Sequence, residues 1–352
     1  MKLSNVLIPL VAIIIALVIG AFIIIAMGLN PVLAYGSLLK GAFGSVYGIT
    51  STLSKATPLI FTGLSFALAK KSGLLNIGAE GQIYLGGLCS VLVGVYIQGV
   101  PMIIHIPLAI FAGFVGGGLW GLLAGWLKVQ FGSSEIITTV MLNYTAMFLV
   151  AYMVNGPIMD GTLPQSKMLL PSATFPNMIQ GTQLHLGFAL SIFVAIICYF
   201  FLWHTRKGYE ARVVGLNPEA ATYAGINRKQ ITYLVMFLAG GLGGLAGTSE
   251  ILGIQHRLYQ SFSPGYGYDG IAVALLGLNN PFGTILAAIL FGALRAGGDM
   301  MQMVAKVPLA LINVIQALVI IFVAAEYLFR RFSRANLRRI KRQEGAVKHE
   351  SA

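Results

Sequence analysis

The sequence has little charge and few of the groups that enzymes use. Only 10% of its 352 residues are Asp, Glu, Lys or Arg, whereas soluble proteins carry about 25%. Its two cysteines, Cys89 and Cys198, lie in separate apolar runs and its five histidines are scattered, so neither a disulfide nor a metal site is expected. No lysine follows a glycine, which excludes a GxxxxGK[ST] phosphate loop, and HExxH and GxSxG motifs are absent. The sequence therefore argues against a soluble protein, an enzyme, and a chain that grips ATP through such a loop.

Long apolar runs make up most of what is present. Hydrophobic residues account for 57% of the chain, and several runs reach the ~20 residues that a helix needs to cross a bilayer. The first run, residues 6–27, is longer than the apolar core of a secretory signal and has no clear cleavage site after it, so it is expected to remain as a span. The chain is predicted to be an integral membrane protein.

Apolar length and breaks at Pro, Gly and charge divide the chain into ten predicted spans. The expected fold class is all-α, with a transmembrane domain over residues 1–330 and a basic tail over 331–352. An extracellular loop is predicted at 155–185 and a cytoplasmic loop at 204–230. The spans are expected near residues 6–28, 53–69, 74–97, 106–127, 135–154, 186–203, 231–252, 267–279, 282–298 and 308–329.

The basic residues predict which side of the membrane each loop faces. With the N-terminus inside, 17 of the 23 Lys and Arg residues fall on inside segments and six on or toward the outside. Cytoplasmic loops carry such an excess, so both termini are predicted to be cytoplasmic, in the plasma membrane, with an even number of crossings. The net charge of +12 follows from this topology, because eight basic residues lie after Phe329 and five in the 204–230 loop. It is not read as a nucleic-acid signal.

The region 267–298 is the least regular of these predictions. A turn signal at residues 279–283 divides it, and its first half, about twelve residues, also fits a re-entrant half-helix. Eight spans is therefore the alternative to ten. With ten, spans two to five and spans seven to ten have opposite orientations, which predicts an inverted repeat.

Polar residues lie inside several predicted spans, where they are costly unless they face the bundle interior or water. In the third span they recur every four residues, which predicts one helical face, and flanking glycines favour a structural hinge and a functional site equally. In the fifth span Glu135, near the helix start, is expected only to complement the helix dipole. The candidates for the substrate path are Asn76, Glu80, Gln82, Tyr84, Asn143 and Tyr144.

Glycine recurs at spacing four in the fourth and seventh spans. Such a stripe lets another helix backbone approach closely, and tight packing is its expected role. The stripes contain Gly113, Gly117, Gly121, Gly125, Gly240, Gly243, Gly244 and Gly247.

The loop at 204–230 is a short basic island that is too organised for a simple connector. Pro218 precedes the helix-favouring run Glu219-Ala220-Ala221 and suits a first helical turn, and Gly225 is placed to end that helix. A small cytoplasmic helix held between two spans is predicted to be a surface on which another protein acts.

Three segments carry a family resemblance over nearly the whole chain. They are GLLNIGAEGQIYLGG (73–87), SSEIITTVMLNYTA (133–146) and GYEARVVGLNPEAATYAGIN (208–227). In order and spacing they resemble the permease subunits of bacterial ABC importers, in the branch shared by branched-chain amino-acid, simple-sugar and nucleoside systems. The first segment resembles the nucleoside and sugar form.

The resemblance implies a transport subunit that has no catalytic residues and no cofactor of its own. ATP would be used by a separate ABC ATPase with two nucleotide-binding sites. The other implied partners are a second permease subunit and an extracellular substrate-binding lipoprotein, in a setting of membrane lipids and without nucleic acid. In the family the 208–227 segment is the coupling helix that docks on the ATPase, which here implies roles for Gly215, Asn217, Pro218, Glu219, Ala220, Ala221 and Gly225.

A nucleoside is the expected substrate, chiefly from the form of the 73–87 segment. The predicted path lacks a cluster of basic residues, which disfavours an anionic cargo. A simple-sugar permease is the nearest alternative. A secondary transporter or channel working alone would need an ion-coupling site, for which Glu80 and Asp269 are the remote candidates, and a structural membrane scaffold would transport nothing.

Overall fold

The computed structural model describes residues 4–308, 310–318 and 321–322. The predicted tail, 331–352, and part of the predicted last span, 308–329, lie outside these residues. The described residues form two compact parts, one from residues 4–37 with the described residues from 298 onward and the other from residues 38–297. All the interactions discussed below lie within residues 38–297.

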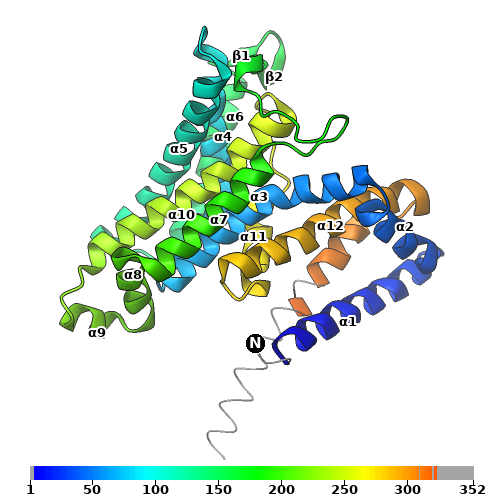
Figure 1. The fold of residues 1–352 in the computed structure, drawn as a ribbon, viewed down its shortest axis with the longest axis horizontal. Helices are drawn as coiled ribbons and strands as arrows, with labels where there is room; N and C mark the ends of the chain where they lie inside the picture. The colour runs from blue at the N-terminus through cyan, green and yellow to red at the C-terminus, as the bar shows by residue number, and fades with distance from the viewer. Residues whose placement is uncertain (1–3, 309, 319–320, 323–352) are drawn as a thin grey trace, which may run out of the picture. The chain divides into compact units, whose positions relative to one another are not determined.

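Helices make up nearly all of the described chain, as expected for an all-α membrane protein (Figure 1). A short antiparallel pair, β1 (Met159–Asp160) with β2 (Leu163–Ser166), and a 3₁₀ turn, Pro171–Ala173, lie in the loop predicted at 155–185. The helices are α1 (Ser4–Ala26), α2 (Pro31–Phe43), α3 (Val46–Lys71), α4 (Ala79–Tyr96), α5 (Met102–Phe131), α6 (Glu135–Val154), α7 (Gly187–His204), α8 (Arg206–Leu216), α9 (Pro218–Tyr223), α10 (Arg228–Glu250), α11 (Tyr266–Leu276) and α12 (Pro281–Ala305).

Five helices of the described chain are long and apolar enough to cross a membrane. They are α5, α6, α7, α12 and the helix over Arg228–Gln255, in which a π-helical segment, Ile251–Gln255, continues α10. The chain is therefore a membrane protein. Helix α3 is as long as several of these, with 26 residues, but its many Ser and Thr residues lower its hydropathy, and most of its side chains from Thr50 to Ala69 are buried by other helices.

Two of the predicted spans differ from the helices that form. The third was expected from residue 74, but α4 begins at Ala79, because Gly73 has a positive φ of 77° after the end of α3 and residues 74–78 are not helical. The eighth corresponds to α11, whose 11 residues rise only about 16 Å, roughly half of the hydrocarbon thickness. This helix is shorter than a full span.

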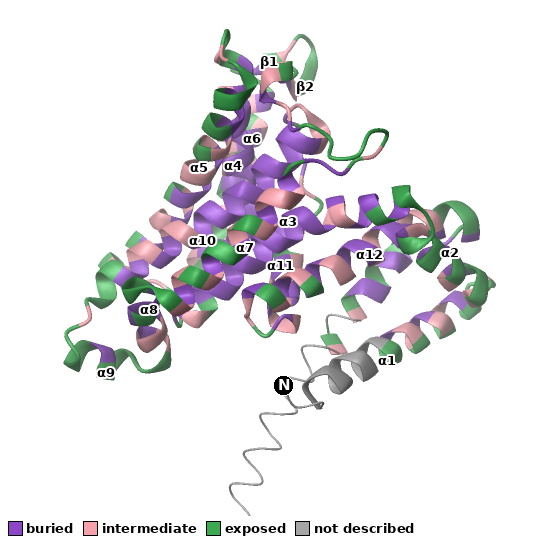
Figure 2. Cartoon of the chain, in the orientation of Figure 1, coloured by how far each residue is buried: buried purple, intermediate pink, exposed green. Residues whose placement is uncertain are grey.

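Helices α4, α5 and α10 pack backbone to backbone through the predicted glycine stripes. A Cβ added at Gly117 in α5 would lie 2.5 Å from the Gly240 carbonyl oxygen and 2.6 Å from the Gly244 Cα. On α4, a Cβ at Gly86 would collide with the Gly244 backbone in the same way. The expected packing role of the stripes is confirmed, and the most buried part of the chain is centred on α3, α4 and α10 (Figure 2).

Candidate functional site

The break between α3 and α4 is held by a closed network of buried amides. The Asn76 and Gln82 side chains exchange two hydrogen bonds, each 3.0 Å long, and Asn76 Nδ2 also donates to Ser65 Oγ of α3 at 3.0 Å. Asn76 Oδ1 additionally accepts from the Gly78 backbone N–H. Ser65 Oγ in turn donates to the Ala239 carbonyl of α10 at 2.6 Å. These bonds link the break between α3 and α4 to α3 and α10.

Asn143 ties α6 to the same break. Its Oδ1 accepts from the Gly81 N–H at 2.8 Å, and its Nδ2 donates to the Ile77 carbonyl at 3.0 Å and to Tyr268 Oη at 3.3 Å. One buried side chain thus joins α6, the start of α4 and the start of α11. Asn143, a candidate from the fifth predicted span, therefore lies beside the third-span candidates at the break.

The first turns of α4 and α11 meet head to head. Glu80 Oε2 accepts from the Gly267 N–H at 2.7 Å, and Gly267 is so close that a Cβ there would collide with the Glu80 backbone. Asn76 precedes α4, so the predicted single helical face with Glu80 and Tyr84 is wrong. The three residues still belong to one region because the chain folds back at the break.

The remaining candidates divide between buried and exposed positions. Tyr84 is buried, and its ring lies 4.9 Å from that of Phe262, centroid to centroid. Tyr144 is 49% exposed on α6, and it takes part in none of the network's hydrogen bonds given above. Glu135 forms an ion pair with Lys128 at 2.5 Å, across the α5–α6 turn, which adds a partner to the expected dipole role.

A half-buried charge pair joins α11 to α12 and was not predicted from the sequence. Arg295 Nη2 of α12 donates to Asp269 Oδ2 of α11 at 2.6 Å, and the guanidinium lies 4.5 Å from the centre of the Tyr266 ring. A repeated pattern was the available signal: Gly78-Ala79-Glu80-Gly81 and Gly267-Tyr268-Asp269-Gly270 both place an acidic residue between two glycines at a helix start.

Removal of Asn76 tests whether the network is structural. Asn76→Ala strands the buried amide of Gln82 and the Gly78 N–H, so it is expected to destabilise the fold by about 3 kcal/mol, with an unchanged KM in the protein that still folds. Thermal unfolding and uptake kinetics measure the two effects. Asn155→Ala removes an asparagine whose Nδ2 bonds are solvent-exposed and is the matched control. Normal stability with a raised KM would instead make Asn76 a substrate contact.

The second candidate region is the α8–α9 element, residues 206–223. Asn217 caps α9, its Oδ1 accepting from the Glu219 and Ala220 N–H groups at 3.0 and 3.1 Å, and Pro218 follows at the first helical position. Gly225 has a φ of 75°, a conformation that favours glycine. The helix predicted from Pro218 and Gly225 is therefore present as α9. A second short helix, α8, precedes it and was not predicted as a separate helix.

The two faces of the α8–α9 element differ sharply. Leu216 and Tyr223 are 87% and 94% exposed, and residues 217–220 are also exposed. Gly215 faces inward, where an added Cβ would collide with the Lys71 carbonyl oxygen and lie 2.8 Å from the Gly73 N. Gly215 is thus required for close packing at the end of α3. A role for Gly215 in coupling would act through this packing.

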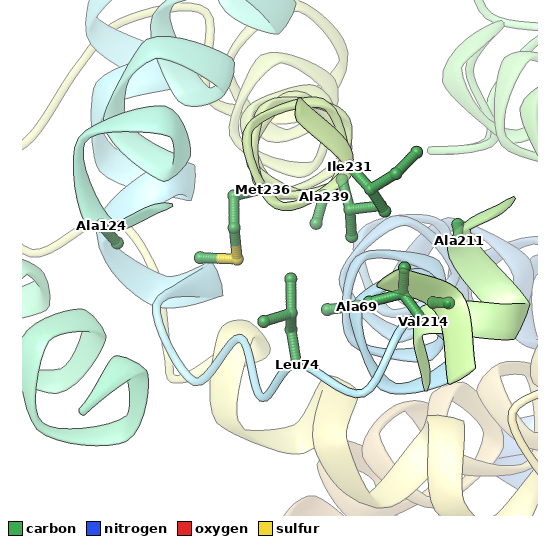
Figure 3. Close-up of a cluster of buried hydrophobic side chains, with 10 residues drawn as sticks. Ala69, Leu74, Ala124, Ala211, Val214, Ile231, Met236 and Ala239 are labelled. Carbon is green, nitrogen blue, oxygen red and sulfur yellow. The ribbon is translucent and has the colours of Figure 1, made fainter. Parts of the chain in front are cut away.

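The inward face belongs to a buried apolar cluster shared with the spans. Ala221 of α9 and Ala211 and Val214 of α8 pack with residues of α3, α5 and α10 (Figure 3). The α8–α9 element is therefore in direct contact with the ends of α3, α5 and α10. The cluster contains Ala69, Leu74, Ala124, Ala211, Val214, Ala221, Ile231, Val235, Met236 and Ala239.

Within the described residues, no three or more His, Cys, Asp or Glu side chains gather as a metal site would require, and both cysteines are free thiols. The two regions are a hydrogen-bonded junction between α3, α4, α6 and α11, and the α8–α9 element, which has an exposed outer face and a packed inner face.

The amino-acid sequence matches a family of known proteins. The model of the branched-chain amino acid transport system / permease component family matches residues 48–324. A guanosine ABC transporter permease protein of Bacillus subtilis is 37% identical, over 94% of this chain and 96% of its own. A nucleoside ABC transporter permease protein of Lactococcus lactis is 37% identical, over 93% of each chain. A glucose ABC transporter permease protein of Haloferax volcanii is 36% identical, over 92% of this chain and 88% of its own.

No solved structure matches the chain. The family match covers well over half of its length and includes the α3–α4 break, the glycine stripes and the α8–α9 element. The chain belongs to the permease-component family of branched-chain amino acid transport systems.

Proposed function

We propose that this chain is the membrane-spanning permease subunit of an ATP-driven ABC importer of nucleosides. The observation that carries the proposal is identity of 37%, over more than nine-tenths of both chains, to permeases named for guanosine and for nucleosides. The geometry supports a transport subunit, because the described residues combine helices long enough to span a membrane with the exposed α8–α9 element. A simple-sugar importer is the second candidate, favoured by the glucose permease at 36% identity.

The α8–α9 element is proposed to be the docking surface for a separate ABC ATPase with two nucleotide-binding sites. Its exposed outer face and its packed inner face suit a part that receives motion at one side and passes it on at the other. Glu219, Ala220 and Tyr223 are the proposed contacts, Asn217, Pro218 and Gly225 shape α9, and Ala221 and Gly215 anchor the element. A second permease subunit and an extracellular substrate-binding lipoprotein complete the proposed importer.

The proposed architecture has about ten spans in one transmembrane domain, residues 1–330, with an inverted repeat of spans two to five and seven to ten. Each half would contain a long buried helix, α3 or α10, followed by a break and a helix that starts with the Gly-x-acidic-Gly pattern, α4 or α11. Half-helices that start inside the bundle are typical of inverted-repeat transporters. In this proposal Asn76, Glu80, Gln82 and Tyr84 hold in place the helices that line the substrate path, without contacting the substrate.

Both termini, and the tail at 331–352, are proposed to be cytoplasmic. The test uses single cysteines at exposed positions on opposite sides: Gln180→Cys in the loop before α7 and Ala224→Cys after α9. An impermeant thiol reagent is expected to label the first only from outside and the second only from inside. Labelling of both from one side would mean that α7 does not cross the membrane, which would contradict the proposed topology. Gln165 is less suitable because it lies half-buried in β2, and Gln343 lies outside the described residues.

Substrate is tested by uptake of labelled guanosine, ribose and leucine in cells with and without the gene. Loss of guanosine uptake alone is the expected result. Loss of ribose uptake alone would favour the sugar importer, and loss of leucine uptake alone would reject both substrates while leaving an importer in place. If uptake of all three is unchanged, the transport role itself fails.

A further inference from the structure

Two cations and a tryptophan gather where α3 and α7 end. Lys71 Nζ lies 5.9 Å from the centre of the Trp203 ring, and the Arg212 guanidinium lies 6.0 Å from the same ring and 5.9 Å from Tyr209. Lys71 is the last residue of α3, Trp203 is one residue from the end of the candidate span α7, and Arg212 lies in α8 just beyond it. The cluster therefore sits at a membrane boundary, where tryptophan is enriched.

The charges of this cluster are not neutralised by the described residues. The carboxylate in α8, Glu210, already accepts from Arg206 at 3.0 Å and from Lys207 at 2.8 Å, and the described residues pair no other carboxylate with Lys71 or Arg212. The Nε of Arg212 is buried and has no hydrogen-bond partner within the described chain. Two cations beside one aromatic ring, with no carboxylate of the described residues paired to them, favour an anion next to them.

An apolar surface leads away from the cations along the membrane. Trp203 stacks on Tyr199, with 5.1 Å between ring centroids, and Tyr199 contacts Phe282 of α12 at 5.0 Å. Ile196, Tyr199, Phe200 and Trp203 follow helical spacing on one face of α7, and Phe282 and Leu286 do so on α12. Of these side chains, Leu286 is 71% exposed, and Ile196, Phe200 and Phe282 are also exposed. We call this surface the α7–α12 lane.

We propose that Lys71, Trp203 and Arg212 bind the phosphate of an anionic phospholipid whose acyl chain lies on the α7–α12 lane. The occupant is a lipid because the anion position and an exposed apolar surface are joined through the Trp203–Tyr199–Phe282 contacts at a membrane boundary. A soluble phosphate compound would bind the two cations but would leave the exposed apolar side chains of the α7–α12 lane without a partner. An acidic surface of a partner protein is the competing source of the negative charge.

The test uses the intrinsic fluorescence of Trp203. The chain contains three tryptophans, so Trp120→Phe with Trp126→Phe leaves Trp203 as the reporter in the full-length protein. The protein is reconstituted in phosphatidylcholine vesicles that contain increasing fractions of brominated phosphatidylglycerol or brominated phosphatidylcholine. A juxtamembrane cation contributes about 1 kcal/mol to binding of anionic lipid, or about fivefold. Two such cations contribute about 2 kcal/mol, so brominated phosphatidylglycerol is expected to quench Trp203 with roughly 25-fold preference over brominated phosphatidylcholine.

Charge variants decide the outcome. Lys71→Gln with Arg212→Gln is expected to abolish the preference, whereas Arg206→Gln, whose side chain is 90% exposed and belongs to the Glu210 pair, is expected to keep it. Equal quenching by both lipids in the parent, or a preference that survives the double substitution, would overturn the site. Loss of the preference when the purified ATPase is added would assign the cations to a protein interface and would also overturn it.

Discussion

Glu219→Arg combined with Tyr223→Ala is expected to reduce transport by at least tenfold while leaving insertion and folding intact. Tyr223 is 94% exposed and Glu219 is exposed in the first turn of α9, so neither change removes buried contacts. Substitutions of this kind usually alter stability by less than about 0.5 kcal/mol. In an interface, by contrast, truncating a central tyrosine and reversing a charge each cost about 2 kcal/mol or more.

The measurement is substrate-stimulated ATP hydrolysis in the assembled transporter, together with the amount of ATPase that co-purifies. Arg228→Gln with Lys229→Gln alters two equally exposed residues at the start of α10 and is the matched control, expected to be near the parent. Full transport by the Glu219/Tyr223 variant would remove α9 from the docking surface. Bulky residues at Gly215 make a poor test, because their collision with the end of α3 would mimic lost coupling.

Gly117→Leu is expected to prevent the described fold from forming. The added Cβ alone would lie within 2.7 Å of three backbone atoms of α10, and backbone cannot step aside as a flexible side chain can. Overpacking usually costs about 1–3 kcal/mol, but separating α5 from α10 along a glycine stripe removes contacts over several turns. A loss of more than about 5 kcal/mol is therefore expected, seen as failure to purify a monodisperse protein.

Gly36→Ala provides the control for this prediction. Gly36 lies in α2, is exposed, and has no described atom within 4 Å of an added Cβ, so alanine there is expected to be neutral or to stabilise the helix by up to about 1 kcal/mol. Gly117→Ala should be intermediate. Normal thermal unfolding of Gly117→Leu would mean that α5 and α10 are not in backbone contact.

Features governed by local sequence were the most predictable. The Pro218 and Gly225 signals located α9 because capping and turn chemistry act over a few residues, and the spacing of Gly113 to Gly125 identified the close-packed face of α5. The break at 74–78 was placed inside a span, since its residues are mostly apolar and only the positive φ of Gly73 ends the regular helix. Apolar length alone cannot distinguish a span from a buried loop that leads into one.

Features governed by contacts distant in sequence were not predictable in the same way. The Asp269–Arg295 pair joins residues 26 positions apart, and the Glu80–Gly267 hydrogen bond joins residues 187 apart. The spacing argument placed Asn76 on a helix with Glu80, whereas its partners are Gln82 and Ser65. A polar residue in a membrane span signals that partners exist, but it does not identify them.

The head-to-head meeting of α4 and α11 also bears on ion leakage, a hazard for any protein that opens a route across a membrane. Each helix start carries a partial positive charge of about half an elementary charge, and Arg295 lies beside the second one. The carboxylates of Glu80 and Asp269 are engaged by the Gly267 N–H and by Arg295, so they offer a passing cation little free negative charge. The two helix starts and Arg295 are thus balanced by two carboxylates, and we expect a route past this junction to favour an uncharged solute over protons and metal cations.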